Sequence, residues 1–418
     1  MKKYWIITFG CQMNRSDSER IAAVLEDSGY QPSVNLPEAD LILVNACSVR
    51  QSAIDRIHGL TPKFKELKAK NHKLKTVLTG CVLKKDKKKI SEKFDLILDI
   101  NDLPELPNFL QASDYKPKNK NYLKIQPKYS TDFTAFIPIM TGCNNFCTFC
   151  VVPYTRGHET SRKTQEILCE VENLAKRGYK EIWLLGQNVN SYKFGEINFP
   201  KLLKEVNNVK GNFWIRFTSS HPKDFSEELI DVMASCKKVT EYLNLPVQSG
   251  DNGILKKMNR PYTTKRYKKI IRKIRERIPN ITLSTDAIVG FPGETERQFQ
   301  NTAELFKEIK FDMAYIAQYS PRAGTKAANL KDNISHQEKE RRWKVLSDIL
   351  KKTALEKNKQ WLGKAVEVLA SEQKNDFLIG KTREFKTTKF KGSENLVGNF
   401  VKIKVAVTLP WGLKGEII

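Results

Sequence analysis

Long hydrophobic runs are missing from this chain of 418 residues. No stretch approaches the roughly 20 apolar residues that a membrane span needs, so we expect no membrane partner. The apolar stretch Tyr4–Phe9 is too short for the hydrophobic region of a signal peptide, and no small-residue cleavage site follows it. We therefore expect a cytoplasmic protein.

Cysteine is scarce as well, with eight residues in the whole chain, which is too few for a disulfide scaffold. The 17 prolines and an aromatic content of 10% exclude a disordered or collagen-like chain. Acidic residues are outnumbered, since 47 Asp and Glu stand against 72 Lys and Arg and leave a net charge of +25. A surplus of this size attracts polyanions such as nucleic acids.

Residues 1–115 alternate short apolar strands with helices. The expected strands are Tyr4–Phe9, Leu41–Val44, Thr76–Thr79 and Leu96–Asp99, and the expected helices are Ser16–Ser28 and Val49–Leu60. This alternation is typical of an α/β fold with a doubly wound parallel sheet of flavodoxin-like type.

Three cysteines follow three of these strands, namely Cys11, Cys47 and Cys81. Ligands of open parallel sheets bind at the carboxyl ends of the strands, so we expect the three thiols to meet at one edge of the sheet. The alternative is three unrelated buried cysteines, because Cys is often a small core residue.

The rest of the chain divides into a linker and two further domains. Residues 116–128 hold five lysines, two prolines and no acid, and we interpret them as a basic, solvated linker. Residues 129–359 are expected to form a partial (βα)6 barrel whose site lies in the loops after its strands. Residues 360–418 alternate in short stretches such as Val401–Val407, which predicts a small antiparallel β-barrel.

Six strand-like runs and the helices between them predict the central barrel. The strands are Phe136–Met140, Ile182–Leu185, Trp214–Phe217, Tyr242–Leu245, Thr282–Val289 and Met313–Tyr319. The helices include Thr164–Arg177, Glu227–Ser235, Thr264–Arg277 and Glu296–Ile309.

The spacing Cys-x3-Cys-x2-Cys of Cys143, Cys147 and Cys150 follows the first barrel strand and is the strongest motif in the chain. Thiolates this close together can bind one inorganic cluster, and three of them leave one iron of a four-iron cubane open to a small molecule. A zinc site would need a fourth ligand, for which His158 is a candidate. A thioredoxin-like use of Cys147 and Cys150 is a further alternative.

Together these motifs resemble the methylthiotransferase family of the radical S-adenosylmethionine superfamily. The resemblance is carried by Phe9–Asn14, Asn45–Arg50, Thr79–Cys81, Cys143–Gly157, Leu185–Ser191, Leu245–Gly250 and Gly290–Thr295. It covers essentially the whole chain in the family's domain order, with the central barrel of radical SAM type. Ala46 departs from the pattern, since Thr is expected there. The segments Gly380–Arg383 and Leu396–Gly398 resemble a TRAM domain, an RNA-binding β-barrel.

The resemblance implies two 4Fe–4S clusters. One, on Cys143, Cys147 and Cys150, would bind S-adenosyl-L-methionine, whose cleavage yields a 5′-deoxyadenosyl radical that attacks the substrate carbon. The other is an auxiliary cluster on Cys11, Cys47 and Cys81, where the sulfur destined for the product would be held. We assign no catalytic side chain.

The substrate implied by the resemblance is tRNA. The amino-acid sequence of Cys143–Gly157 is most similar to that of family members which insert a methylthio group at C2 of N6-isopentenyladenosine next to the anticodon. The same chemistry on threonylcarbamoyl-adenosine in tRNA, or on an aspartate of a ribosomal protein, is the alternative. A non-catalytic iron–sulfur or zinc RNA-binding protein is the alternative of a different class. The expected partners are the anticodon stem-loop of tRNA and an electron donor protein, and a monomer is compatible with the sequence.

Several further residues are candidates for weaker reasons. Contacts to the cofactor or substrate are considered for Gly186, Gln187, Ser219, Gln248 and Asp286, with turn or cap roles as the alternative. Arg156 is expected to pair with a carboxylate or phosphate, or else to make a surface ion pair. Cys169 and Cys236 have no neighbouring ligands and are predicted to be buried structural thiols.

Basic residues suggest two surfaces. In the last domain, positive charge interleaves with aromatic rings in a mixture suited to RNA, at Lys381, Arg383, Phe385, Lys386, Lys389, Phe390 and Lys391. The helix Thr264–Arg277 is also strongly basic, and we interpret its charged face as solvated.

Overall fold

A five-stranded parallel sheet forms the N-terminal part of the computed structural model, which describes residues 1–47, 51–83, 90–110 and 121–418. The strands are β1 (Lys3–Thr8), β2 (Gln31–Pro32), β3 (Leu41–Cys47), β4 (Lys75–Cys81) and β5 (Leu96–Ile97). They lie in the order β2-β1-β3-β4-β5, and every neighbouring pair is parallel. The order 2-1-3-4-5 is the flavodoxin-like arrangement, so the predicted fold is confirmed.

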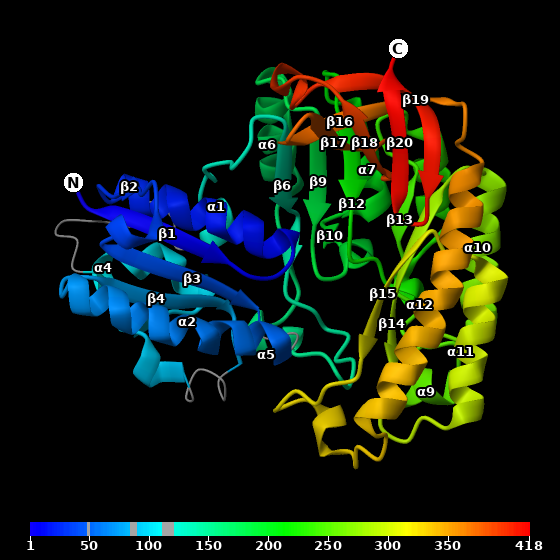
Figure 1. Cartoon of the computed structure of the whole chain (residues 1–418), viewed down its shortest axis with the longest axis horizontal. Coiled ribbons are helices and arrows are strands. Elements are labelled where there is room, and N and C mark those ends of the chain that lie inside the picture. Colours follow the sequence, from blue (N-terminus) through cyan, green and yellow to red (C-terminus); the bar gives the residue numbers. More distant parts are fainter. Residues whose placement is uncertain (48–50, 84–89, 111–120) are drawn as a thin grey trace. The chain divides into compact units, whose positions relative to one another are not determined.

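Helices cover both faces of this sheet, with α1 (Gln12–Asp27) on one face and α2 (Gln51–Lys70) on the other (Figure 1). Successive side chains of a strand point to opposite faces, so Leu43 joins the core that contains α1 while Val44 joins the core that contains α2. The predicted helix Val49–Leu60 begins among residues that lie outside the described part, and α2 continues well past its predicted end.

Contacts within the chain define two compact units. The first comprises Met1–Ser130, Met140–Arg162 and Ser320–Asn329, and the second comprises Thr131–Ile139, Lys163–Tyr319 and Leu330–Ile418. Short elements of the first unit are α4 (Leu106–Phe109), α5 (Val152–Thr155), β7 (Met140–Thr141) and β8 (Thr160–Ser161). All six cysteines that the sequence analysis selected as ligands belong to the first unit.

The segment interpreted as a linker, 116–128, is described only from residue 121 onward, and its expected boundary at residue 115 lies outside the described residues. Tyr122 and Leu123 are buried in the core that contains α1. Tyr122 and Leu123 therefore pack on the sheet, so the part of the segment that they belong to is not a solvated connector. Two apolar residues among lysines have no periodicity, so the sequence pattern does not indicate their burial.

Six parallel strands form the first part of the second unit. They are β6 (Thr134–Pro138), β9 (Glu181–Leu185), β12 (Trp214–Phe217), β13 (Tyr242–Asn244), β14 (Thr282–Val289) and β15 (Met313–Gln318). They form the sheets β12-β9-β6 and β13-β14-β15, which a parallel bridge between Ile215 and Val239 connects. This open row of βα units confirms the predicted partial (βα)6 barrel.

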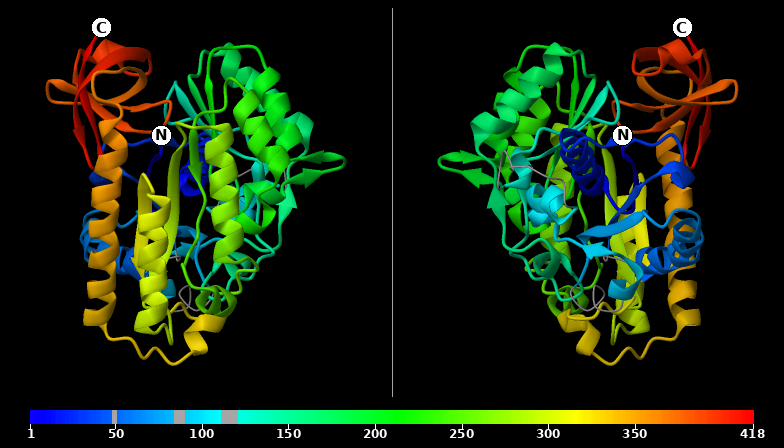
Figure 2. Two further views of the ribbon diagram at one scale, coloured as in Figure 1. Left: turned by 90° about the vertical axis from the view of Figure 1, so that its right-hand side faces the viewer. Right: turned by 90° about the vertical axis from the view of Figure 1, so that its left-hand side faces the viewer.

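Helices lie on the outer side of these strands (Figure 2). They are α6 (Thr164–Lys176), α7 (Phe199–Asn208), α8 (Glu227–Ser235), α9 (Asn252–Lys257), α10 (Thr264–Arg277), α11 (Glu296–Ile309) and α12 (His336–Lys359), and a small hairpin consists of β10 (Lys193–Phe194) and β11 (Ile197–Asn198). The sequence pattern did not predict the long helix α12, because two of its buried positions are the charged Lys339 and Arg342. Their ion pairs with Asp332 and Glu294 allow this burial but obscure the apolar period.

The C-terminal strands close into a small barrel in the order β16-β17-β18-β20-β19. The strands are β16 (Ala365–Lys374), β17 (Phe377–Thr382), β18 (Thr387–Lys391), β19 (Phe400–Leu409) and β20 (Gly412–Ile417). Four neighbouring pairs are antiparallel, and the pair β18–β20 is parallel. The predicted β-barrel is thus confirmed. Within the described ranges, no helix is long and apolar enough to cross a membrane.

Candidate functional site

Cys11, Cys47 and Cys81 gather at the carboxyl edge of the N-terminal sheet, as the sequence analysis expected. Cys47 and Cys81 are the last residues of β3 and β4 and are Cα partners across that strand pair. Cys11 is the N-cap residue of α1, and a Cβ on its neighbour Gly10 would lie 3.1 Å from the Cβ of Cys47. Their role as metal ligands stays a prediction.

Glycine is required beside two of these cysteines. Gly80 has a φ of +100°, and a Cβ there would lie 2.4 Å from the carbonyl oxygen of Ala46. Gly10 has a φ of +127° and lies against the side chain of Asn14. Only glycine accepts both the dihedral angle and the close approach, so each Gly-Cys pair brings its cysteine close to the neighbouring strand.

Two asparagines connect the start of α1 to the end of β3. Asn14 Nδ2 donates to Asn45 Oδ1 at 3.1 Å and to the carbonyl oxygen of Ala46 at 2.9 Å. In return, Asn45 Nδ2 donates to the carbonyl oxygen of Asn14 at 2.7 Å. Both side chains are buried, so these bonds hold the loop of Cys11 against the strand of Cys47.

Cys143, Cys147 and Cys150 lie in the loop between β7 and α5. The base of the loop is closed by the antiparallel pair β7–β8 and by the backbone N–H of Cys143, which donates to the carbonyl oxygen of Gly157 at 3.1 Å. The N–H of Cys150 donates to the carbonyl oxygen of Cys147 at 2.9 Å, so the backbone makes a turn between these two cysteines. Cys143 is buried, and this burial raises the pKa of its thiol.

A single metal ion and a four-iron cluster require different arrangements of their protein ligands. Among the residues that the structure describes, no three His, Cys, Asp or Glu side chains are arranged to hold one metal ion. A cubane is wider than one ion, so its thiolates need not converge on a single point. His158, the candidate fourth ligand of a zinc site, is exposed, and its Nδ1 lies 3.2 Å from Asn144 Oδ1.

Arg156 is buried at the end of α5 and contacts the trio of Cys11, Cys47 and Cys81. Its Nε donates to Cys81 Sγ at 2.8 Å, and its Nη2 donates to Asp17 Oδ2 at 2.6 Å. Its Nη1 donates to the hydroxyl of Tyr122 at 3.3 Å. The expectation of a carboxylate partner is confirmed, and the alternative of a surface ion pair is wrong.

Burial and nearby charges act in opposite directions on the pKa values of Cys81 and Arg156. Burial raises the pKa of the Cys81 thiol to about 12, while the nearby Arg156 acts to lower it. Burial also lowers the pKa of Arg156, but Asp17 and Cys81 outweigh it and bring that pKa well above its usual range. The arginine therefore stays cationic beside the sulfur.

Unpartnered polar atoms collect after β9 and β12, at the carboxyl end of the partial barrel. Within the described residues, these buried atoms without a hydrogen bond are Gln187 Oε1, Asn188 Oδ1, Asn190 Nδ2, Ser220 Oγ and His221 Nε2. Buried polar groups without partners are rare in proteins, so the cluster indicates a place for a polar ligand. Only Gln187 was a candidate from its sequence context. The position of the other four residues just after β9 and β12 was the signal that could have found them.

His221 is uncharged in this cluster. Burial, with Arg260 and Lys223 nearby, lowers the pKa of its imidazole to about 2. Its Nδ1 accepts from the N–H of Lys223 at 3.2 Å, so the proton resides on Nε2.

The other candidate residues in the loops and strands of the partial barrel differ in their backbone conformation and in their hydrogen-bond partners. Ser219 and Gln248 have positive φ angles of 66° and 67°, which a non-glycine residue adopts at a cost. Asp286 Oδ2 accepts from Asn244 Nδ2 at 3.2 Å, so it has a structural partner. Gly186 directly follows β9.

The two remaining cysteines differ from each other. Cys236, the C-cap residue of α8, is buried as predicted. Cys169 is exposed, so the prediction of a buried thiol is wrong for it. Residue type alone suggested burial, but its position on α6 faces solvent.

Most of the RNA-binding residues expected in the C-terminal barrel are used inside the second unit. Lys386 forms a buried ion pair with Asp312, and Arg383 Nε donates to Glu241 Oε2 at 2.7 Å. Phe390 is a core residue of the small barrel. The prediction is therefore wrong for these three residues.

Phe385 of the C-terminal barrel also packs against the partial barrel. Its ring lies 4.3 Å from the ring of Tyr242 and 5.3 Å from that of Trp183, measured between centroids. Arg216, which pairs with Glu181, donates to the carbonyl oxygens that precede Phe385 in the same turn. These partners stand at or near the amino ends of β9, β12 and β13, so the small barrel covers the end of the partial barrel opposite the unpartnered cluster. Burial lowers the pKa of Lys381 in this contact, whereas Lys391 is exposed.

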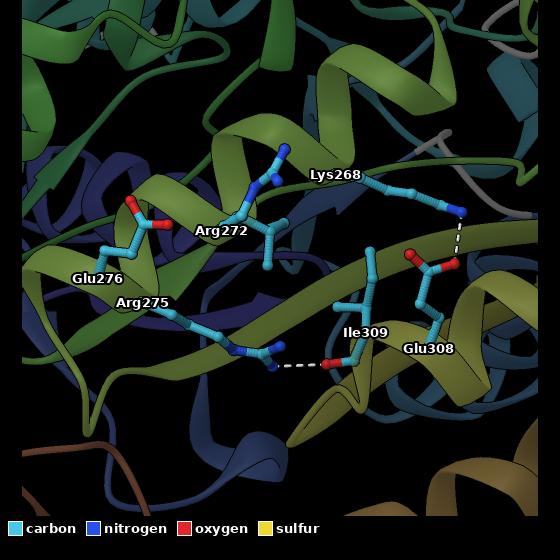
Figure 3. A pocket seen from close by; sticks show the side chains of 7 residues that line it. Lys268, Arg272, Arg275, Glu276, Glu308 and Ile309 are labelled. Carbon is cyan, nitrogen blue, oxygen red and sulfur yellow. Dashed lines mark hydrogen bonds and ion pairs between the residues drawn. The ribbon is translucent and has the colours of Figure 1, made fainter.

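Some of the basic side chains of helix α10 have partners on neighbouring elements, while others, such as Lys265 and Lys269, are exposed. Figure 3 shows the shallow pocket beside it, where Lys268 pairs with Glu308 and Arg275 Nη2 donates to the carbonyl oxygen of Ile309 at 2.5 Å. Lys273 pairs with Glu227 on α8. These contacts favour a structural role for the basic face.

Comparison with known proteins identifies the family. The radical SAM superfamily matches residues 137–306, and the uncharacterized protein family UPF0004 matches residues 3–99. The tRNA-2-methylthio-N(6)-dimethylallyladenosine synthase of Thermoanaerobacter sp. (strain X514) is 44% identical over 435 residues, which cover 99% of this chain and 92% of that protein. The protein of the same name from Dictyoglomus thermophilum (strain ATCC 35947 / DSM 3960 / H-6-12) is 43% identical, covering 100% of this chain and 99% of that protein.

Solved structures share the fold. The radical S-adenosylmethionine methyltransferase TsrM from Kitasatospora setae, solved with cobalamin and a 4Fe–4S cluster bound, is similar with a TM-score of 0.50 at 15% identity, covering 81% of this chain and 78% of TsrM. The cobalamin-dependent S-adenosylmethionine radical enzyme OxsB has a TM-score of 0.54 at 12% identity, covering 85% of this chain and 56% of OxsB. By its sequence over nearly its full length, the chain belongs to the radical S-adenosylmethionine family of the tRNA-2-methylthio-N(6)-dimethylallyladenosine synthases.

Proposed function

We propose that this enzyme inserts a methylthio group at C2 of N6-isopentenyladenosine next to the anticodon of tRNA. The names of its relatives supply the reaction and the nucleoside. The observation that carries the proposal is the gathering of Cys11, Cys47 and Cys81 at one sheet edge. Cleavage of S-adenosylmethionine needs only one cluster and therefore one trio of thiolates. A second trio is expected in an enzyme that must also hold the sulfur it transfers.

Radical SAM membership implies an iron–sulfur cluster and S-adenosyl-L-methionine. We assign one 4Fe–4S cluster to Cys143, Cys147 and Cys150 and an auxiliary one to Cys11, Cys47 and Cys81. When bound, each cluster would supply one iron without a protein ligand, to hold and reduce S-adenosylmethionine at the first trio and to hold the transferred sulfur at the second. An electron donor protein is then a necessary partner.

The protein's own groups bind and orient the reactants. The closed base of the Cys143 loop sets the position of its three sulfurs, and the Asn14–Asn45 bonds do the same for the loop of Cys11. We assign polar contacts with the cofactor or the nucleoside to Asn188, Asn190 and His221. Because His221 is neutral, it offers its Nε2 proton without adding charge.

Binding of tRNA rests on the net charge of +25, although the contributing surface is narrower than the sequence pattern indicates. In the C-terminal barrel, Lys389 and Lys391 are the expected residues left for phosphates. A tRNA substrate and reduced thiols are consistent with action in the cytoplasm, and a monomer is sufficient for all of these roles.

The decisive experiment is anaerobic reconstitution followed by an assay on an isopentenylated anticodon stem-loop, with the product nucleoside analysed by mass spectrometry. We expect a mass increase of one methylthio group on the adenosine. A stem-loop with unmodified adenosine is the matched control and should not react. Product on a threonylcarbamoylated stem-loop or a ribosomal protein instead would overturn the assignment, and one bound zinc without cleavage of S-adenosylmethionine would indicate a non-catalytic RNA-binding protein.

A further inference from the structure

Arg156 is close to one trio of cysteines in sequence and contacts the other trio with its side chain. It follows Cys150 by six positions, at the C-cap of the short helix α5, where its N–H donates to the carbonyl oxygen of Val152 at 2.9 Å. Its side chain is 2% exposed and ends at Cys81 of the other trio. The segment that leaves the Cys143 loop therefore supplies a cationic hydrogen-bond donor to a sulfur of the N-terminal sheet.

The donor is held in a defined orientation. A planar guanidinium carries its N–H groups in a fixed fork, and here Nε, Nη1 and Nη2 each have a different partner. The side chain of Asp17 is 0% exposed and forms an ion pair with Arg156, while its Oδ1 has no hydrogen-bond partner within the described residues. Moving the guanidinium away from Cys81 would leave this carboxylate buried without compensation, which is costly.

We propose that Arg156 is a positioning residue that sets the reduction potential of the auxiliary cluster, through its hydrogen bond to Cys81 and its charge balance with Asp17. The proposal rests on the proposed function, because it needs a cluster at Cys11, Cys47 and Cys81. Hydrogen bonds to the sulfurs and the local net charge are two of the factors that set such potentials. A donor and a positive charge both favour the reduced, more negative state, whereas a carboxylate disfavours it.

The two members of the pair should therefore have opposite effects. Arg156→Gln removes the cation and shifts the potential downward, while Asp17→Asn leaves the cation uncompensated and shifts it upward. A purely structural role would not give two shifts of opposite sign. Arg56→Gln, the same change at an exposed position of α2, is the matched control and should leave the potential unchanged.

The measurement is a redox titration followed by electron paramagnetic resonance on the full chain, with Cys143, Cys147 and Cys150 changed to Ala so that one cluster remains. If Arg156→Gln alone fails to fold, the double variant Arg156→Gln/Asp17→Asn leaves no unpaired buried charge, and the loss of the hydrogen bond should still lower its potential. An unchanged potential in both Arg156 variants would overturn this inference alone. Failure of the parent chain to hold about four irons would overturn the auxiliary cluster itself, and with it the proposed function.

Discussion

Lys386 of the C-terminal barrel forms a buried ion pair with Asp312, with Nζ and Oδ1 2.6 Å apart and both side chains less than 5% exposed. The second oxygen of Asp312 accepts from the backbone N–H of Leu283 at 3.0 Å. One carboxylate thus connects β14, the start of β15 and the small barrel. The last domain and the partial barrel are therefore coupled within one unit.

Breaking this pair should destabilise the protein. Lys386→Met leaves Asp312 buried without its cation, and we expect a loss of about 3 kcal/mol in the free energy of unfolding. The double variant Lys386→Met/Asp312→Asn should recover part of it. Chemical denaturation measures both. The exposed pair of Lys310 and Glu356 is the control, since Lys310→Met should cost less than about 1 kcal/mol. Equal losses at the two sites would contradict the buried role.

Cys147→Ala should abolish the cleavage of S-adenosylmethionine and halve the iron content, from about eight to about four irons per chain. Binding of tRNA should remain largely intact, because the change is small and local. The matched control is Cys169→Ala on α6, at an exposed cysteine outside both trios, which should keep both iron and activity. Cleavage retained in Cys147→Ala would refute the assignment of this trio.

Gly80→Ala should displace Cys81. The added methyl group meets the carbonyl oxygen of Ala46 at 2.4 Å, and the φ of +100° is strained for alanine. We expect a loss of at least about 1 kcal/mol in the free energy of unfolding and a lower iron content. Gly59→Ala on α2 meets nothing within 4 Å and should be neutral or stabilising. If both variants kept full iron, the close approach at Gly80 would have no role in the site.

The pKa of His221, lowered to about 2, predicts a dependence of stability on pH. In the unfolded chain this histidine takes up a proton below about pH 6.5, whereas in the folded chain it stays neutral. Stability is therefore fully present above that pH and falls by up to about 1.4 kcal/mol for each pH unit below it. Urea denaturation of the apoprotein at pH 5 and pH 7 measures the effect.

His221→Asn should reduce the difference between these two pH values. His158→Asn, at an exposed histidine, is the control and should leave it unchanged. An identical pH dependence in wild type and His221→Asn would show that the imidazole is not buried as described.

Binding of tRNA should weaken steeply with salt, because each phosphate contact releases counterions. The double variant Lys389→Gln/Lys391→Gln should lower the slope of log affinity against log salt by about 1 to 2. Lys381→Gln is the contrasting control, since this half-buried lysine donates to Thr387 Oγ1 within the second unit and should leave the slope unchanged. Filter binding over a range of salt concentrations distinguishes the two, and a slope change only in Lys381→Gln would reverse our assignment of the surface.

Much of the fold follows from local pattern. Apolar runs separated by amphipathic helices predicted the N-terminal parallel sheet and the strands of the partial barrel, and the bounds of β12 and β14 agree with the expected ones. Tyr122 and Leu123 show the limit of this approach, because two buried residues among lysines have no period to detect. The same limit applies to α12, where the ion pairs of Lys339 and Arg342 replace apolar contacts.

The amino-acid sequence by itself determined that Cys11, Cys47 and Cys81 meet, because each follows a strand of one parallel sheet and such a sheet brings all carboxyl strand ends to one edge. Only the tertiary structure decided that Arg156 ends at Cys81, that Lys386 and Phe385 are used for packing, and that Cys169 faces solvent. Partners so distant in sequence depend on how separate elements pack together, and neither composition nor periodicity contains that information.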